Sequence, residues 1–186
     1  WIVVGIWILA LLAGVYGSSA ASINFLVSFF WIALLLGGVY LSAIFGNGVA
    51  LLSPLRTIAL FIAHDRALVS YPKKLGHTPA LIAYALVILL EFSPHSMGID
   101  PSFLAGALIG YTVYTLLGTF LFGVRDWFYY ADCFSVLFRV IGKVAPFDFA
   151  HGALRLRMPF SALATEYASS FSETLLIIFL LASTMF

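Results

Sequence analysis

Two aspartates and a histidine in the second half of the chain, Asp132, Asp148 and His151, are the side chains whose chemistry could serve catalysis. Carboxylates and imidazoles act as general bases and as metal ligands. Asp148 and His151 are close enough in sequence to touch one metal ion together. The other histidines lie in separate loops, and no H-x-H or H-E-x-x-H motif is present. We therefore predict no metal site and no cofactor.

Polar side chains also interrupt the long apolar runs. Glu91 is an acidic residue inside such a run, where a carboxylate is costly and marks a proton or cation site. The alternative is an interfacial carboxylate bonded to a neighbouring helix or to water. Hydroxyls recur at helical spacing at Thr112, Thr115 and Thr119. They could line a substrate path with Tyr111 and Tyr114, or bond back to the helix backbone.

The composition places these residues in a membrane protein. Only 9% of the 186 residues are charged, and 63% are hydrophobic. The mean hydropathy is +1.09, which excludes an ordinary soluble core. The formal net charge of +1 gives no sign of nucleic-acid binding. One cysteine, Cys133, excludes an internal disulfide framework.

The apolar runs predict a bundle of about five transmembrane helices in a single, all-α integral membrane domain over residues 1–186. The expected spans are 1–16, 23–45, 79–92, 101–122 and 171–186. Three helix starts carry an N-cap residue before a proline, at Ser53-Pro54, Thr78-Pro79 and Asp100-Pro101. The first residue is Trp1, and the chain is apolar from there, so we expect it to be part of a longer polypeptide.

The basic residues predict the orientation of this bundle. All nine Lys and Arg fall between Arg56 and Lys74 or between Arg125 and Arg157. Basic loops stay on the cytoplasmic side of a membrane. We therefore expect the loops 46–78 and 123–170 to lie on the cytoplasmic side of the cell inner membrane, with interfacial segments at 54–70 and 124–144.

The segment 124–144 predicts one amphipathic helix at this interface. A single face of that helix carries Arg125, Asp132, Ser135, Arg139 and Lys143. The interpretation is that Asp132 pairs with the flanking cations, which also contact lipid phosphates. Alternatively, the polar stripe lines a cavity and binds an anionic ligand or partner. The alternation from Leu154 to Met158 predicts a short hairpin-like loop, whose Arg155 and Arg157 join the headgroup-binding set.

A pair of glycines in the fourth span predicts close helix packing. Gly106 and Gly110 form a G-x-x-x-G pattern, which lets a neighbouring helix approach its backbone. Bound lipids and other membrane subunits are the partners we expect.

Three sequence runs resemble a multi-pass membrane family named fenitrothion hydrolase. They are Phe45-Gly46-Asn47-Gly48-Val49 to Ser53-Pro54-Leu55-Arg56, Phe122 to Phe134, and Gly152 to Ser161. The similarity covers roughly residues 24–184. The family has a Gly-Asp-Ala-Phe-like run where this chain has Ala131-Asp132-Cys133-Phe134, so the carboxylate is kept. The family name implies phosphotriester hydrolysis, yet the clustered His and Asp ligands of metal-dependent phosphotriester hydrolases are not found in this sequence.

These observations leave three classes of function. The first, which we favour, is a non-catalytic membrane subunit that packs in a larger complex, such as an energy-transducing or oxidoreductase complex. The second is a transporter for small molecules or ions that uses Glu91 and the threonine face. The third is a membrane-bound phosphotriester hydrolase using Asp132, Asp148 and His151.

Overall fold

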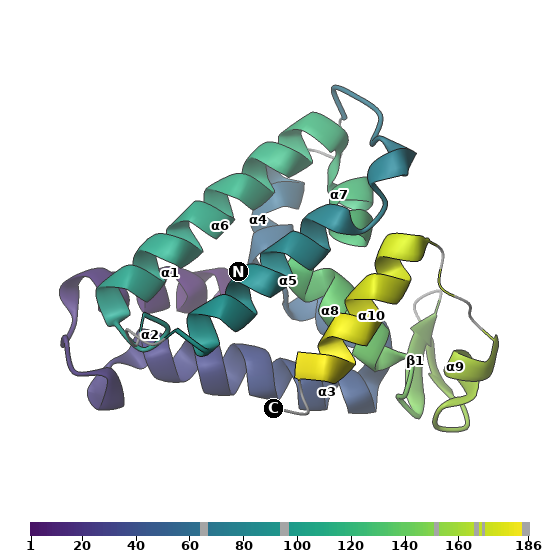
Figure 1. Cartoon of the computed structure of the whole chain (residues 1–186), viewed down its shortest axis with the longest axis horizontal. Coiled ribbons are helices and arrows are strands. Elements are labelled where there is room, and N and C mark those ends of the chain that lie inside the picture. Colours follow the sequence, from purple (N-terminus) through teal and green to yellow (C-terminus); the bar gives the residue numbers. More distant parts are fainter. Residues whose placement is uncertain (64–66, 94–96, 151–152, 166–167, 169, 184–186) are drawn as a thin grey trace.

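The computed structural model describes the chain except residues 64–66, 94–96, 151–152, 166–167, 169 and 184–186. It also leaves out the side chains at 47, 49, 63, 148–150, 153–155 and 164. The described part is helical, apart from two short strands (Figure 1).

The first half of the chain contains α1 (Ile2–Tyr16), the short η1 (Ala21–Ile23) and a long helix over Phe25–Phe45. The long helix comprises α2 (Phe25–Ser28), the π-helical η2 (Phe29–Gly37) and α3 (Gly38–Phe45). After it come η3 (Gly46–Leu52), α4 (Pro54–Ala63), η4 (Lys73–Leu75) and α5 (Thr78–Glu91). Asn24 begins the long helix by accepting a hydrogen bond from the Leu26 N–H.

The second half begins with the longest single α-helix of the described chain, α6 (Pro101–Phe122). It is followed by α7 (Val124–Tyr130), α8 (Cys133–Gly142), β1 (Phe147–Ala150), β2 (Ala153–Leu156), α9 (Ser161–Thr165) and α10 (Phe171–Ser183). The strands pair antiparallel, with Phe147 opposite Leu156, where the sequence predicted a hairpin. The predicted N-caps at Ser53 and Asp100 are confirmed by hydrogen bonds from the N–H groups of Arg56 and Phe103. At α5 the cap position is instead His77.

Two helices, Phe25–Phe45 and Pro101–Phe122, are long and apolar enough to cross a membrane. Three further apolar helices, α1, α5 and α10, occupy the other predicted spans but have only 15, 14 and 13 residues. The long helix and α6 come together at one end and diverge toward the other (Figure 1). α7 and α8 fill the opening, with α7 against α6 and α8 against α3.

The connections group at two ends of this bundle. At one end the Trp31 indole N–H donates a 2.7 Å hydrogen bond to the Gly98 carbonyl, so the loop before α6 lies on the long helix. At the other end the long connections 46–77 and 123–170 meet, because Gly142 packs on the backbone of Gly46 and Arg139 contacts His77. All Lys and Arg belong to these two connections, and we call this end the basic end.

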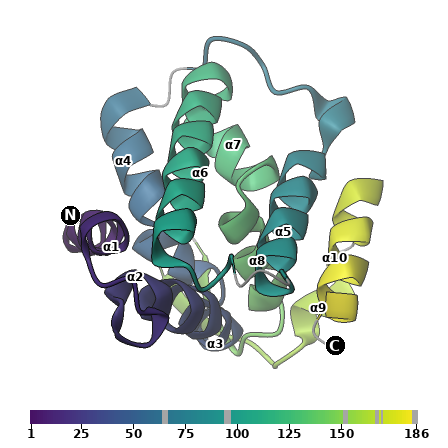
Figure 2. The same cartoon turned by 60° about the vertical axis from the view of Figure 1, so that its left-hand side comes forward.

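The prediction of one amphipathic helix over 124–144 is wrong. The chain bends at Ala131 and Asp132, and α7 and α8 are separate helices (Figure 2). α8 is largely buried, with Val136 and Leu137 inside the bundle and Phe138 stacked beside Gly38 of α3. The polar face was predicted on the assumption that 124–144 is one uninterrupted helix. Asp132 instead caps the start of a second helix, α8.

A glycine turn and one close approach position α7 against α6. Gly123 ends α6 with a φ of 84°, a backbone conformation that glycine adopts without strain. The chain then turns back, and the Trp127 indole lies directly on Gly118, where an added Cβ would be 2.2 Å from the ring. Trp127 also stacks on Phe122 and contacts Tyr114 edge-on. This aromatic packing positions the start of α8, and with it Asp132.

Candidate functional site

Asp132 lies at the break between α7 and α8 and is 2% exposed. One carboxylate oxygen accepts the N–H of Ser135 at 2.9 Å and so caps α8. The other accepts the Tyr111 hydroxyl of α6 at 2.5 Å. The predicted ion pairing of Asp132 with the cations before and after it along one helix is therefore replaced by a cap and a bond to α6, because α7 and α8 do not share a helical face.

The surroundings of Asp132 form a small buried polar cluster. The Tyr111 hydroxyl also accepts the Cys133 N–H at 3.1 Å, and Thr115 is fully buried beside it. Burial raises the pKa of Asp132 above its ordinary value, while hydrogen bonds from Ser135 and Tyr111 oppose that rise. Burial also raises the pKa of the Cys133 thiol well above its usual range, which keeps it protonated and unreactive.

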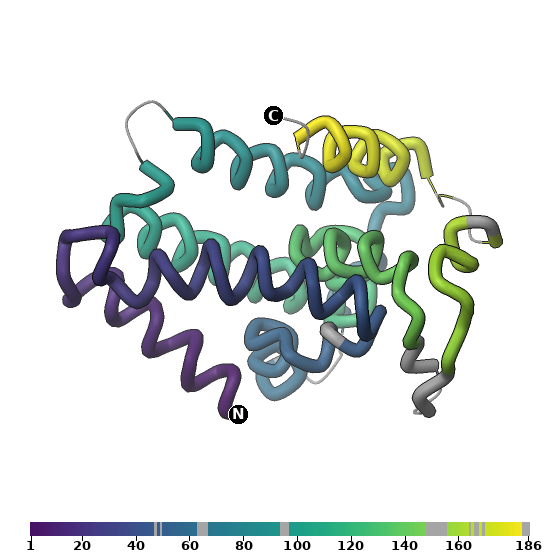
Figure 3. The backbone as a smooth tube through the Cα atoms, turned by 90° about the horizontal axis from the view of Figure 1, so that it is seen from below, coloured from purple at the N-terminus to yellow at the C-terminus, as the bar shows by residue number. Residues whose placement is uncertain are grey.

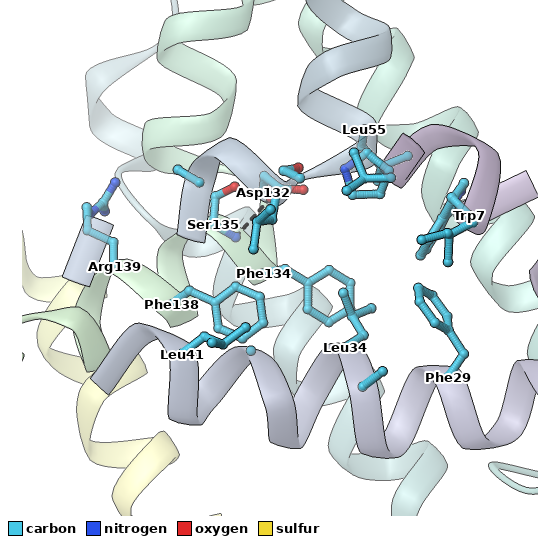
Figure 4. A pocket seen from close by; sticks show the side chains of 18 of the residues that line it. Trp7, Phe29, Leu34, Leu41, Leu55, Asp132, Phe134, Ser135, Phe138 and Arg139 are labelled. Atoms are coloured by element: carbon cyan, nitrogen blue, oxygen red, sulfur yellow. Dashed lines mark hydrogen bonds between the residues drawn. The ribbon is translucent and has the colours of Figure 1, made fainter. Parts of the chain in front are cut away.

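A cavity of about 170 Å³ adjoins Asp132, between α1, the long helix, η3, the start of α4 and α8. Figure 4 shows Asp132, Ser135 and Arg139 along one side. Apolar side chains surround the remaining space, among them Trp7, Phe29, Leu34, Leu55, Phe134 and Phe138. The predicted alternative, a polar stripe that lines a cavity, therefore describes α8 better than a helix lying flat on a membrane surface.

Arg139 belongs to a second, partly buried network, which ties together α7, α8 and the starts of α5 and α10. Its guanidinium donates to the Tyr129 carbonyl at 2.7 Å, lies 4.1 Å from the centre of the Tyr129 ring and contacts His77 Nε2 at 3.0 Å. Because arginine only donates, Nε2 is the acceptor, and His77 is neutral with its proton on Nδ1. The Nδ1–H group donates to the Ser170 hydroxyl oxygen, which lies 3.1 Å from Nδ1.

The electrostatics of His77 agree with this neutral form. The side chain is fully buried. Burial lowers the pKa of His77, Glu173 opposes the shift, and the positive charge of Arg139 adds to it. The His77 backbone N–H is held by the Ser172 hydroxyl at 2.7 Å, which fixes the start of α5 against the start of α10. Figure 3 shows these two helices side by side along one edge.

Most of the predicted headgroup-binding cations are engaged inside the protein. Lys143 Nζ lies 3.7 Å from a carboxylate oxygen of Glu173, and these side chains are 12% and 5% exposed. Arg157 donates to the carbonyls of Ala145 and Gly142 at 2.8 and 2.6 Å and so caps the end of α8. Arg125 is exposed, and the Arg155 side chain lies outside the described residues. Arg139, Lys143 and Arg157 therefore make tertiary contacts within the protein, and their binding of lipid headgroups stays a prediction.

The predicted intramembrane polar residues do not meet in one path. Glu91 is exposed at the last position of α5. The hydroxyls of Thr112 and Thr119 donate to carbonyls of their own helix, at Leu108 and Leu116. Thr115 is the member of this face that lies beside Asp132. The backbone-bonding interpretation therefore holds for two of the three threonines.

Gly106 and Gly110 face open space. A Cβ at either position would meet nothing within 4 Å. Gly110 lines an open groove of about 760 Å³ between α5 and α6, together with apolar residues such as Ile82, Leu86 and Phe103. Within the described chain, close helix packing uses other glycines, such as Gly14 of α1 against Leu26 and Ala105.

Of the three catalytic candidates, Asp132 is the one whose side chain lies within the described part of the chain. The side chain of Asp148 and the whole of His151 lie outside the description. The described residues contain no group of three His, Cys, Asp or Glu side chains with the geometry of a metal site. Asp132 caps the start of α8, and the strands follow the other end of that helix along the chain.

Comparisons with protein-family models, with curated proteins and with solved structures gave no match to this chain. The site therefore has to be interpreted from its own chemistry.

Sequence reasoning missed the partners of the site residues. Tyr111 was identified only as a path-lining side chain, and nothing in the sequence pairs it with Asp132. His77 and Arg139 are 62 positions apart. The aspartate itself could have indicated the break at position 132. Aspartate is a common N-cap, because its carboxylate accepts the backbone N–H three residues later.

Proposed function

We propose that the protein is a multi-pass membrane protein in which α1, the long helix, α5, α6 and α10 cross the bilayer. The outward faces of these helices support this proposal. They expose large apolar side chains such as Ile32 and Leu36 of the long helix, Val113 and Leu117 of α6, and Ile178 of α10. A surface of this kind is stable in lipid and unfavourable in water. The basic end then faces the cytoplasm, at the inner membrane.

We propose further that the chain is a non-catalytic subunit that packs against a transmembrane helix of another subunit in a larger membrane complex. The observation that carries this proposal is the groove between α5 and α6. Its walls are apolar, and Gly110 presents bare backbone in it, while Gly106 presents bare backbone one turn earlier on α6. A helix can approach such a surface closely, which gains dispersion contacts and weak hydrogen bonds. Lipids would cover the remaining apolar faces.

The transporter and hydrolase alternatives have less support. A transporter would use polar groups that converge from several spans, whereas Thr112 and Thr119 bond to their own helix. A hydrolase of the kind the family resemblance implies would need a nucleophile and a base near each other. Asp132 instead serves as a cap and an acceptor for Tyr111.

Partner recovery tests the packing proposal. The native protein is solubilised in mild detergent, and co-purifying membrane proteins are compared between wild type, Gly110→Leu and Gly5→Leu. Gly5 of α1 is the matched control, because a Cβ there also meets nothing within 4 Å but lies outside the groove. We expect Gly110→Leu to lose a specific partner and Gly5→Leu to keep it. Recovery of wild type without any other protein chain, or equal recovery in all three, contradicts the proposal.

Cysteine labelling tests the topology separately. Single cysteines at Ser70 and Ser161, in a Cys133→Ser background, should react only from the cytoplasm. Cysteines at Ser19 and Ser102, both exposed at the other end, should react only from outside. Labelling of Ser70 and Ser102 from the same side would refute the proposed crossings.

A further inference from the structure

A buried carboxylate beside an apolar cavity calls for an explanation beyond helix capping. An N-cap serves α8 equally well when its far side meets solvent. Here Asp132 is 2% exposed, yet it lines the cavity of about 170 Å³. Placing a carboxylate against apolar walls costs free energy, because the charged form loses its hydration. A carboxylate in such a place is best explained if it also binds a ligand.

The hydrogen bonds around Asp132 favour its anionic form. The Tyr111 hydroxyl and the Ser135 N–H both donate to it, one to each oxygen. Donors that point at a carboxylate stabilise its negative charge. Each carboxylate oxygen has a second lone pair, so the group can accept a further donor from the cavity side.

Arg139 does not supply a positive charge at the centre of this cavity. Its guanidinium contacts the Tyr129 carbonyl, the face of the Tyr129 ring and His77 Nε2. In Figure 4 the head of Arg139 points away from the row of aromatic rings. Of the two charged side chains that line the cavity, Arg139 has its guanidinium engaged with Tyr129 and His77, so the Asp132 carboxylate is the one next to the apolar walls. This favours a cationic ligand over an anionic one.

The walls of the cavity can contact the apolar part of a cationic ligand. Rings of Trp7, Phe29, Phe134 and Phe138 line the cavity, and an aromatic face attracts an ammonium group. An apolar protein cavity of about 150 Å³ holds one benzene molecule, so this one accepts a single ring or a short alkyl chain. Ser53 and Ser135 add hydroxyls near the polar side.

We propose that this cavity is a binding site for a small lipophilic amine, held as its ammonium ion by Asp132 with its apolar body among Leu34, Phe134 and Phe138. The ammonium group donates to the carboxylate, and the apolar part leaves water or lipid. No covalent step is involved. The proposal does not depend on the packing role of the α5–α6 groove, which is a separate space on the other side of Phe134.

Benzylamine and benzyl alcohol are the probes that test this site. They have the same ring and differ in the charge of the polar group at neutral pH. Binding to the purified full chain in detergent or lipid nanodiscs is measured by titration calorimetry. We expect benzylamine to bind at least about tenfold more tightly than benzyl alcohol, which corresponds to about 1.4 kcal/mol. Equal affinity for the two, or no binding of benzylamine, overturns the proposal.

Two variants then locate the amine. Asp132→Asn keeps an N-cap acceptor and removes the charge, and Leu34→Trp fills the cavity from the opposite wall without touching the carboxylate. Both should weaken benzylamine binding at least about tenfold. An effect of Leu34→Trp alone would mean that the carboxylate does not recognise the amine. An effect of Asp132→Asn alone would mean that the amine binds outside the cavity. Either result refutes the proposed amine site. If a variant does not fold, the affinities of wild type for benzylamine and benzyl alcohol still test the proposal.

Discussion

The Tyr111 hydroxyl of α6 and the Asp132 carboxylate at the start of α8 are joined by a 2.5 Å hydrogen bond. This contact connects the middle of a helix long enough to cross a membrane to the start of a buried helix at the basic end. Because Asp132 also caps α8, the same side chain fixes both where α8 begins and how it sits against α6.

Removing the Asp132 side chain should therefore destabilise the protein through two lost contacts. We expect Asp132→Ala to lower the free energy of unfolding by about 1–3 kcal/mol, since it deletes the cap and leaves the Tyr111 hydroxyl without its acceptor. Asp132→Asn keeps an acceptor and should cost less. Unfolding in mild detergent measures both. If Tyr111→Phe and Asp132→Ala have fully additive effects in the double variant, the two side chains do not stabilise each other.

The ion pair between Lys143 and Glu173 gives a second prediction. These side chains are 12% and 5% exposed, so removing one of them leaves a buried charge without this partner. We expect Glu173→Gln or Lys143→Met to cost about 3 kcal/mol. The double variant Lys143→Met with Glu173→Leu should recover part of that loss. Single variants as stable as wild type would show that the ion pair does not stabilise the folded protein.

The stability of the protein should fall as the pH is lowered past the ordinary pKa of histidine. The pKa of His77 in the folded protein is lowered from the usual value of 6.5, mainly by burial. Below pH 6.5 the unfolded chain therefore binds a proton that the folded protein does not, and this favours unfolding. Above pH 6.5 both states carry neutral His77, and the effect vanishes.

Melting temperatures in detergent between pH 7.5 and 5.5 check this prediction. His77→Gln is the matched variant, because its amide also has one donor and one acceptor group and does not titrate. The variant should lose a large part of the pH dependence seen in wild type. The same slope in both proteins would assign the pH dependence to other groups.

The sequence allowed the apolar helices to be predicted well and the interior of the basic end poorly. Runs such as 101–122 are defined by local hydropathy, and α6 has those bounds. The segment 124–144 has a helical pattern, but its division at Asp132 depends on a bond to Tyr111 and on Trp127 packing against Gly118. Such contacts join distant positions, so periodicity within one segment does not contain them. For the same reason Lys143 and Arg157 could not be distinguished from lipid-facing cations.

Two glycines of α6 distinguish a packing contact from an open face. Gly118→Ala places a Cβ 2.2 Å from the Trp127 indole, which is rigid and stacked on Phe122, so the ring and α7 must move. We expect this variant to lose about 1–3 kcal/mol of stability, as overpacked cores do. Gly106→Ala in the same helix meets nothing within 4 Å and should gain about 0.5–1 kcal/mol from helix propensity. Unfolding of the isolated chain in detergent measures both changes. If the two substitutions shift stability by the same amount and in the same direction, Trp127 does not lie on Gly118, and the placement of α7 against α6 is wrong.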